Sequence, residues 1–386
     1  MKKYIALTLL AMSGLKTMAQ QGPTRAITTA VPFLSIAADP RAAAMGDMGV
    51  ATSADAFAQQ WNPAKLAFAE SKQSVGLTYT PYLSKLVNDI FLGNISYHNR
   101  LNERSAIGAS LRYFSNGEIE LRESFDSPAF IAKPNELALD LSYSLRLSDE
   151  FAMAVSGRYI HSDLKLQTGF DDAQAANSIA VDIAGYYEGP TQIHKDFNGR
   201  WRAGFNISNL GPKMKYDDRT DGAFLPTNLG VGVGYDFILD AHNKVGVTAE
   251  FNKLLVPTPP ALEEGEIDEN RRKIDDYNDI GWFSGVFKSF GDAPDGFSEE
   301  LKEITWALGA EYWYEDVFAL RAGYFNESEE KGAREFFSLG AGFKYTTINI
   351  DMSYLFSTSK TNNPLEGTLR FGLTFSFGDN AFKNID

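Results

Sequence analysis

Residues 368–377 read TLRFGLTFSF and alternate strictly between large apolar residues and small or polar ones. Successive side chains of an extended chain point to opposite faces, so a period of two predicts a β-strand. One face carries Leu369, Phe371, Leu373, Phe375 and Phe377, and the other carries Thr368, Arg370, Gly372, Thr374 and Ser376. We therefore expect this strand to separate an apolar environment from a polar one.

The same alternation recurs along the chain and predicts an all-β fold of 14 strands. Their expected ranges are 75–81, 91–97, 107–114, 137–147, 151–163, 179–187, 201–209, 229–238, 245–255, 306–314, 318–324, 337–345, 348–356 and 368–377. The connections between them alternate between long and short, and 188–199 is an exception that is longer than the other short ones. This pattern indicates a transmembrane antiparallel β-barrel, which has short periplasmic turns and long external loops. A soluble sandwich or propeller is the alternative, but it would expose many aromatic side chains to water.

The composition favours a membrane protein made of strands. The chain has 28 Phe, 17 Tyr and 33 Gly, yet its mean hydropathy is slightly polar at -0.24. Only alternate residues of a barrel strand meet lipid, which reconciles the two observations. The sequence lacks a later run of about 18 apolar residues, so a helical inner-membrane protein is excluded.

The N-terminal residues predict export to the cell outer membrane. Lys2 and Lys3 precede an apolar stretch, and Thr17 and Ala19 place small residues where a signal peptidase reads them. Removing the expected signal peptide, residues 1–19, takes away three lysines and lowers the net charge from -14 to -17. So acidic a chain is not expected to bind nucleic acid. The absence of cysteine excludes disulfides and thiol chemistry.

Charged residues recur on the polar faces of the expected strands, where exposure to lipid would be costly. We expect them in the lumen, as an ionic lining or as contacts of a plug. They are Arg112, Arg146, Arg158, Arg321, Arg370, Asp140, Asp182, Glu311 and Asp351. A stripe of small residues on one strand also indicates the approach of a plug or a bend. It consists of Gly230, Gly232 and Gly234.

Residues 20–72 precede the first strand and are too long for a simple tail. Residues 39–46 begin with Asp-Pro and are Ala-rich, which predicts a short helix, and residues 61–64 predict a compact turn. The hatch motif comprises Asp39, Arg41, Met45, Gly46, Trp61, Asn62 and Pro63. This arrangement, together with the strand number, resembles the FadL-like outer-membrane barrels. The resemblance implies an N-terminal hatch that plugs the lumen.

Within that superfamily, the longest connection resembles the PorV/PorQ family of the type IX secretion system. Residues 281–294 read GWFSGVFKSFGDAP, and residues 296–303 read GFSEELKE. The resemblance implies a non-enzymatic shuttle that binds the C-terminal signal domain of secreted cargo. Its implied partners are a translocon pore subunit of the SprA/Sov type, the cargo domains, the sortase PorU and its attachment complex.

The same loop, 256–302, also predicts a helix from its residues alone. Large apolar side chains recur there at spacings of one, three and four, which is typical of one helical face. They are Trp282, Phe283, Val286, Phe287 and Phe290. Such a face is a partner-binding site if it is exposed. It is a lid if it packs over the barrel mouth, and both interpretations stay open.

We find no catalytic, cofactor-binding or metal-binding pattern and expect a protein that is not an enzyme. The histidines have no close metal-ligand spacing: His98, His161, His194 and His242. His161 and Asp163 share a face of the fifth strand, but no nucleophile accompanies them. A surface hydrolase of lipid would rest on this pair alone.

The second function class, favoured by the hatch, is a FadL-like transporter of long-chain fatty acids or other hydrophobic solutes. It requires an apolar pocket near the plug and a lateral gap between strands. In either case we expect residues 73–377 to form the barrel within outer-membrane lipid. The loop 256–302 then faces the cell exterior, and residues 378–386 form a periplasmic tail.

Overall fold

The computed structural model describes residues 25–122, 129–164, 174–216, 222–263, 265–359 and 363–379. The expected signal peptide lies outside these residues, as does the tail from residue 380 onward. The expected hatch is described from residue 25.

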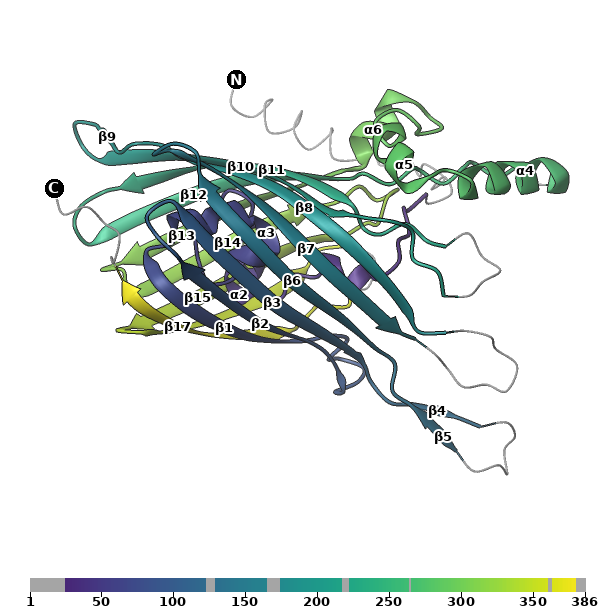
Figure 1. Ribbon diagram of the computed structural model, residues 1–386, viewed down its shortest axis with the longest axis horizontal. Helices are drawn as coiled ribbons and strands as arrows, with labels where there is room; N and C mark the ends of the chain where they lie inside the picture. The colour runs from purple at the N-terminus through teal and green to yellow at the C-terminus, as the bar shows by residue number, and fades with distance from the viewer. Residues whose placement is uncertain are drawn as a thin grey trace, which may run out of the picture.

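Within the described residues, 14 antiparallel strands form a closed barrel (Figure 1). They are β1 (Ser71–Pro81), β2 (Ile90–Arg100), β3 (Ser105–Asn116), β6 (Asn135–Arg146), β7 (Phe151–Asp163), β8 (Ala176–Glu188), β10 (Asn198–Leu210), β11 (Asn228–Ile238), β12 (Asn243–Leu254), β13 (Ile304–Tyr314), β14 (Phe318–Asn326), β15 (Glu335–Tyr345), β16 (Ile348–Ser357) and β17 (Leu369–Asp379). Each strand pairs with its neighbours along the chain, and β17 pairs with β1, with Ser71 opposite Asp379 and Tyr79 opposite Phe371. The predicted barrel and its strand number are confirmed.

Three short strands were not predicted. β4 (Ile119–Leu121) and β5 (Phe130–Ala132) form a hairpin that extends the connection between β3 and β6 away from the barrel (Figure 1). β9 (Gln192–Ile193) pairs with the start of β10 and accounts for the one unusually long turn. Two or three residues are too few to display a recognisable period of two.

The alternation of each strand separates lipid from lumen. On β17, Leu369, Phe371 and Phe377 are exposed, whereas Arg370 is buried. The predicted luminal charges are buried inside the barrel, apart from the half-buried Arg146, whose guanidinium lies 4.7 Å from the centre of the Phe68 ring. The apolar faces therefore point outward, as the sequence pattern predicts.

The two ends of the barrel differ. Short turns gather at one end, together with the paired strand ends Ser71 and Asp379, and we call it the turn end. The longer connections gather at the other, the loop end. There, the connection between β12 and β13 carries α4 (Ile267–Asn278), α5 (Trp282–Lys288) and α6 (Phe297–Lys302), which project beyond the barrel (Figure 1). No helix among the described residues is both long and apolar enough to cross a membrane.

Residues 25–70, which we call the hatch, run from the loop end into the barrel, and residues 30–69 are largely buried within it (Figure 1). They contain η1 (Pro32–Ser35), α2 (Pro40–Ala44), α3 (Ala58–Trp61) and η2 (Pro63–Phe68). The described hatch starts at the loop end, where the Arg25 N–H donates to the carbonyl of Glu330 at 3.2 Å, and it joins β1 at the turn end. An even strand count returns the strand ends to one side, but the hatch places Arg25 on the other.

Glycines of the wall lie where the hatch comes closest. A Cβ atom at Gly323 would be 2.1 Å from the backbone carbon of Met45, and one at Gly232 would be 2.8 Å from Cβ of Ala51. Gly230 likewise faces a hatch residue, so the predicted small-residue stripe is confirmed at these two positions. Gly234 differs, because its neighbours are the wall side chains Thr248 and Arg202.

We expect Gly323→Ala to destabilise the barrel by about 1–3 kcal/mol, because the added methyl group overlaps backbone atoms of the hatch. The measurement is the temperature at which the folded barrel loses its compact mobility on a denaturing gel. Gly157→Ala is the control, because nothing lies within 4 Å of its added Cβ. Equal transition temperatures for the two variants would contradict the close fit of the hatch.

Candidate functional site

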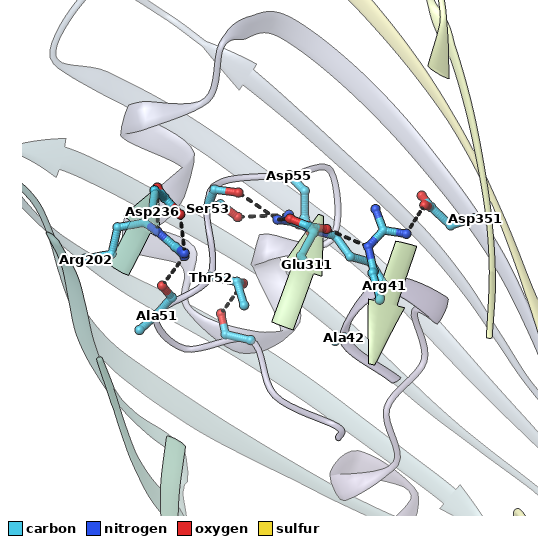
Figure 2. Close-up of polar contacts among 12 residues, drawn as sticks. Arg41, Ala42, Ala51, Thr52, Ser53, Asp55, Arg202, Asp236, Glu311 and Asp351 are labelled. Atoms are coloured by element: carbon cyan, nitrogen blue, oxygen red, sulfur yellow. Dashed lines mark hydrogen bonds and ion pairs between the residues drawn. The ribbon is translucent and has the colours of Figure 1, made fainter. Parts of the chain in front are cut away.

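Arg41 of the hatch ties α2 to the barrel wall through a bidentate ion pair. Its Nε and Nη2 donate to the carboxylate of Glu311 on β13 at 2.9 and 2.8 Å, and its Nη1 donates to Asp55 at 2.8 Å (Figure 2). Arg321 on β14 donates to Glu311 at 2.5 Å and to Asp351 on β16 at 2.6 Å. One network thus joins the hatch to three strands.

The remaining polar residues of the hatch motif hold the hatch together. Asp39 caps α2 by accepting from the Ala42 N–H at 2.8 Å, and its other oxygen accepts from the Trp61 indole at 2.6 Å. Asn62 caps η2, and its amide donates to the carbonyl of Gly185 on β8 at 3.0 Å. Two helix caps and two cross-links explain why these residue types occur at these positions.

Met45 and Gly46 complete the motif. Met45 is buried in a cluster with Phe325 and Phe336 of the wall. Gly46 adopts a φ of 82°, and a Cβ atom there would be 2.8 Å from the carbonyl oxygen of Tyr324. Only glycine combines this left-handed conformation with so close an approach.

A second set of contacts anchors the segment between α2 and α3. Arg202 on β10 donates to the carbonyl of Ala51 at 2.6 Å and is paired with Asp236 (Figure 2). Glu250 on β12 accepts from the N–H groups of Gly49 and Val50 at 2.9 and 2.8 Å. Charged wall residues therefore bind the hatch backbone from several directions.

A charge ladder crosses the opposite wall. Arg112 on β3, Asp140 on β6, Arg158 on β7 and Asp182 on β8 form consecutive ion pairs, with 3.6 Å between Arg112 and Asp140 and 2.8 Å between Arg158 and Asp182. Arg112 also donates to the carbonyl of Leu34 in the hatch at 3.1 Å. These charges pair with each other and with the plug, as expected for a filled lumen.

The predicted partner-binding residues occupy α5 and the residues that follow it. Phe283, Phe287 and Phe290 are 61%, 65% and 54% exposed, whereas Trp282 and Val286 are half-buried. Phe290 lies beyond the end of α5 rather than on it. The sequence placed all five on one face, but the structure turns only the three phenylalanines fully to the outside.

The opposite side of α5 explains how it is held. Gly285 is buried, and a Cβ atom there would lie 3.1 Å from the Phe224 ring and from Pro257. Phe224 belongs to the connection between β10 and β11, and its ring also contacts Tyr277 of α4 at 6.0 Å between centroids. Helix α5 therefore packs on the loop end and also exposes an aromatic edge, and the partner-binding site stays a prediction.

Ion pairs hold α6 at the loop end, next to α5. Glu303 is buried, which opposes its ionisation, but hydrogen bonds from Lys253 and Lys331 keep the pKa of its carboxyl below the ordinary value. Burial raises the pKa of Asp292 to about 6, and the nearby Glu300 and Glu303 add to this. Lys253 thus binds the carboxylates of Glu300 and Glu303, and Lys331 also binds that of Glu303.

The histidines do not form a site. The His161 ring nitrogen lies 2.8 Å from the Asn177 amide oxygen, which orients the ring. His98 bonds to Ser74 in the lumen, while His194 and His242 have partners at the turn end: Tyr235 and Glu315. Over the described ranges, no group of three acidic or histidine side chains is arranged to hold a metal ion.

Residues 18–261 match the family model of the type IX secretion system protein PorV. The chain belongs to the PorV family. The match covers more than half of the chain and includes the hatch and the first nine barrel strands, but it ends before α4, α5 and α6. Family membership therefore does not depend on the aromatic loop. No curated protein matches the sequence significantly.

Solved structures share the fold. The TodX ΔS2S3 mutant, a monoaromatic hydrocarbon channel, has a TM-score of 0.50 and 12% identity over 88% of this chain and 98% of its own. The toluene transporter TbuX of Ralstonia pickettii has a TM-score of 0.48 and 14% identity, over 88% of this chain and 98% of that chain. A Pseudomonas aeruginosa FadL homologue has a TM-score of 0.45 and 12% identity, with the same coverage. At this identity the TodX comparison shows a shared β-barrel fold and nothing finer.

We expect Arg41→Ala to lower the free energy of unfolding by about 3–5 kcal/mol, because it leaves buried acids without their partner. Guanidinium unfolding of the barrel in lipid vesicles measures the change. The matched control is Lys244→Ala, which removes a solvent-exposed pair with Asp316 and is expected to cost less than about 1 kcal/mol. If both variants unfold at the same denaturant concentration, the network does not anchor the hatch.

Proposed function

We propose that this PorV-family barrel is a non-enzymatic shuttle of type IX secretion. It binds the C-terminal signal domain of secreted cargo at the translocon and delivers the cargo to the surface attachment complex. Membership of the family makes the chain a type IX secretion component of the outer membrane. The steps of binding and delivery are the proposal.

The exposed aromatic edge of α5 carries this proposal. Phe283 and Phe287 stack edge to face with 5.4 Å between ring centroids and remain more than half exposed. Rigid aromatic side chains that are already ordered lose little entropy on binding, so they are effective anchors in protein interfaces. Gly285 holds this edge on the loop end of the barrel, where a neighbouring protein can reach it.

The proposed orientation places the loop end outside the cell and the turn end in the periplasm. Outer-membrane barrels have short periplasmic turns and long external loops, and this chain shows that division. In this orientation α5 projects from the cell surface. The translocon subunit, the cargo domain and the PorU attachment complex are then the candidate partners of that edge.

Solute transport is the second candidate, supported by the barrel fold that the chain shares with the TodX channel. One observation bears on it directly: the ladder between β8 and β10 has a bulge near Asn209. The bulge is closed from inside, because the Asn209 N–H donates to Asp182 at 2.7 Å and its amide donates to the Pro226 carbonyl at 2.9 Å. Together with the anchored hatch, these bonds favour a platform over a pore.

We expect a photo-cross-linker at position 287, in place of Phe287, to capture the translocon subunit or a cargo domain in intact cells. The same group at position 267 on α4 is the control, because Ile267 is also largely exposed but lies outside the proposed edge. Phe287→Ala is expected to weaken partner binding by about 2 kcal/mol, which corresponds to a loss of affinity of about 30-fold. Normal surface display of cargo in cells that lack this protein would contradict the proposal.

Uptake of a labelled long-chain fatty acid separates the two candidates. Cells with and without the protein are expected to take it up equally, because the hatch fills the lumen and each strand is paired on both sides. A marked drop in uptake without the protein would instead favour transport.

A further inference from the structure

Helix α6 has its polarity inverted relative to an ordinary surface helix. Its acids Glu299 and Glu300 are 1% and 7% exposed, whereas Phe297 and Leu301 are 77% and 53% exposed. Phe297 and Leu301 are four residues apart and share one face of the helix. A helix surrounded by water buries its apolar face and exposes its charges. The outer face of α6 is therefore built for an apolar environment.

Lys253 explains why the acids point inward. Along β12, Val247 and Phe251 are exposed on the lipid-facing side, and the alternation places Lys253 on the same side. Its ammonium donates to Glu300 at 3.0 Å and to Glu303 at 2.6 Å. Helix α6 thus covers a lysine on the outer side of the wall and neutralises it there.

Two more cations hold α6 in this orientation. Lys331, from the connection between β14 and β15, donates to Glu299 at 2.6 Å and to Glu303 at 2.8 Å. Arg25, at the start of the described hatch, donates to Glu299 at 2.9 and 3.0 Å. Since three separate segments bind the acidic side, the helix cannot roll over to bury Phe297.

The exposed face of α6 continues the lipid-facing surface of the barrel. Strand β13 begins two residues after α6 ends. On its outer side, Trp306 contacts Tyr324 at 5.4 Å between ring centroids, and Tyr324 contacts Phe337 at 4.7 Å. A girdle of such rings marks the boundary between membrane and water. In Figure 1, α6 stands outside the outline of the barrel wall at the loop end.

We propose that α6 is an interfacial membrane anchor whose Phe297 and Leu301 lie among the lipids that surround the loop end. A short helix with one apolar face rests at the boundary between headgroups and acyl chains in this way. Lipid is the occupant because the face adjoins the lipid-facing wall, and because the side that could bind another segment is already filled by cations. The anchor fixes the height of α5 above the membrane.

Spin labelling tests the proposal on the full chain, which contains no cysteine. Nitroxide labels are attached to the single variants Phe297→Cys and Leu301→Cys in vesicles of phosphatidylethanolamine and phosphatidylglycerol. We expect both labels to collide more with oxygen than with a water-soluble nickel complex, as at the lipid-facing reference Phe337→Cys. The water reference Ile267→Cys on α4 is expected to show the opposite order. Values at 297 and 301 that match position 267 would overturn the proposal.

A second variant tests the attachment of α6 to Lys253. Lys253→Met in the Phe297→Cys protein is expected to shift the label toward the water reference, because α6 loses its attachment to the wall. Lys302→Met is the control, since Lys302 pairs with Glu330 on the exposed side of the same helix. An unchanged label in Lys253→Met would refute the role of Lys253. Protection from nickel that appears only when cargo or translocon is added would assign the face to a protein instead of lipid.

Because these measurements use the protein without partners, their failure is separate from a failure of the shuttle proposal.

Discussion

In hydrocarbon, a backbone N–H or C=O group without a partner costs several kcal/mol, and every strand of this barrel meets that demand by pairing on both sides. Closure between β17 and β1 removes the last free edges. The lipid environment also determines the polarity of the outer side chains, because the outer face of a closed sheet in lipid must be apolar. The inner face is then free to be polar, and here it carries charge.

The filled lumen follows from those inner charges. A buried ion without a partner is far more costly than a buried pair. Arg321 alone faces the two carboxylates of Glu311 and Asp351, so Glu311 needs the hatch residue Arg41 as much as the hatch needs Glu311. Apolar contacts add to this, since Phe33 and Leu34 of the hatch pack with Phe114 of the wall. Wall glycines allow the two backbones to approach. The result is a plug bound from many directions rather than a gate on a single hinge.

With the hatch inside the barrel, the helices of the loop end are the part of the described chain that projects beyond the wall. Both α5 and α6 expose large apolar residues, but they are held differently. Helix α5 rests on a buried glycine and leaves its phenylalanines in the open, whereas α6 is held by ion pairs that involve the wall, a neighbouring loop and the hatch. Arg25 thus connects the plug to the helices outside, although it is separated from Glu299 by most of the chain.

The sequence by itself determined the barrel, the number of its strands and the sidedness of their residues. A period of two is a local property of the sequence. In residues 368–377 the type of each residue indicates whether it faces lipid or the lumen. The same holds for the capped start of α2 at Asp39 and Pro40, and for the helical spacing of Phe283 and Phe287. The sequence could not show which charged residues pair with each other in the folded chain. Arg41 meets Glu311, and Lys253 meets Glu303, only because strand register and loop folding bring distant segments together. The tertiary structure alone decided that Trp282 and Val286 turn partly inward, that α6 exposes its apolar face, and that the described hatch begins at the loop end. Those outcomes depend on contacts between residues far apart in the chain, and no local pattern encodes them.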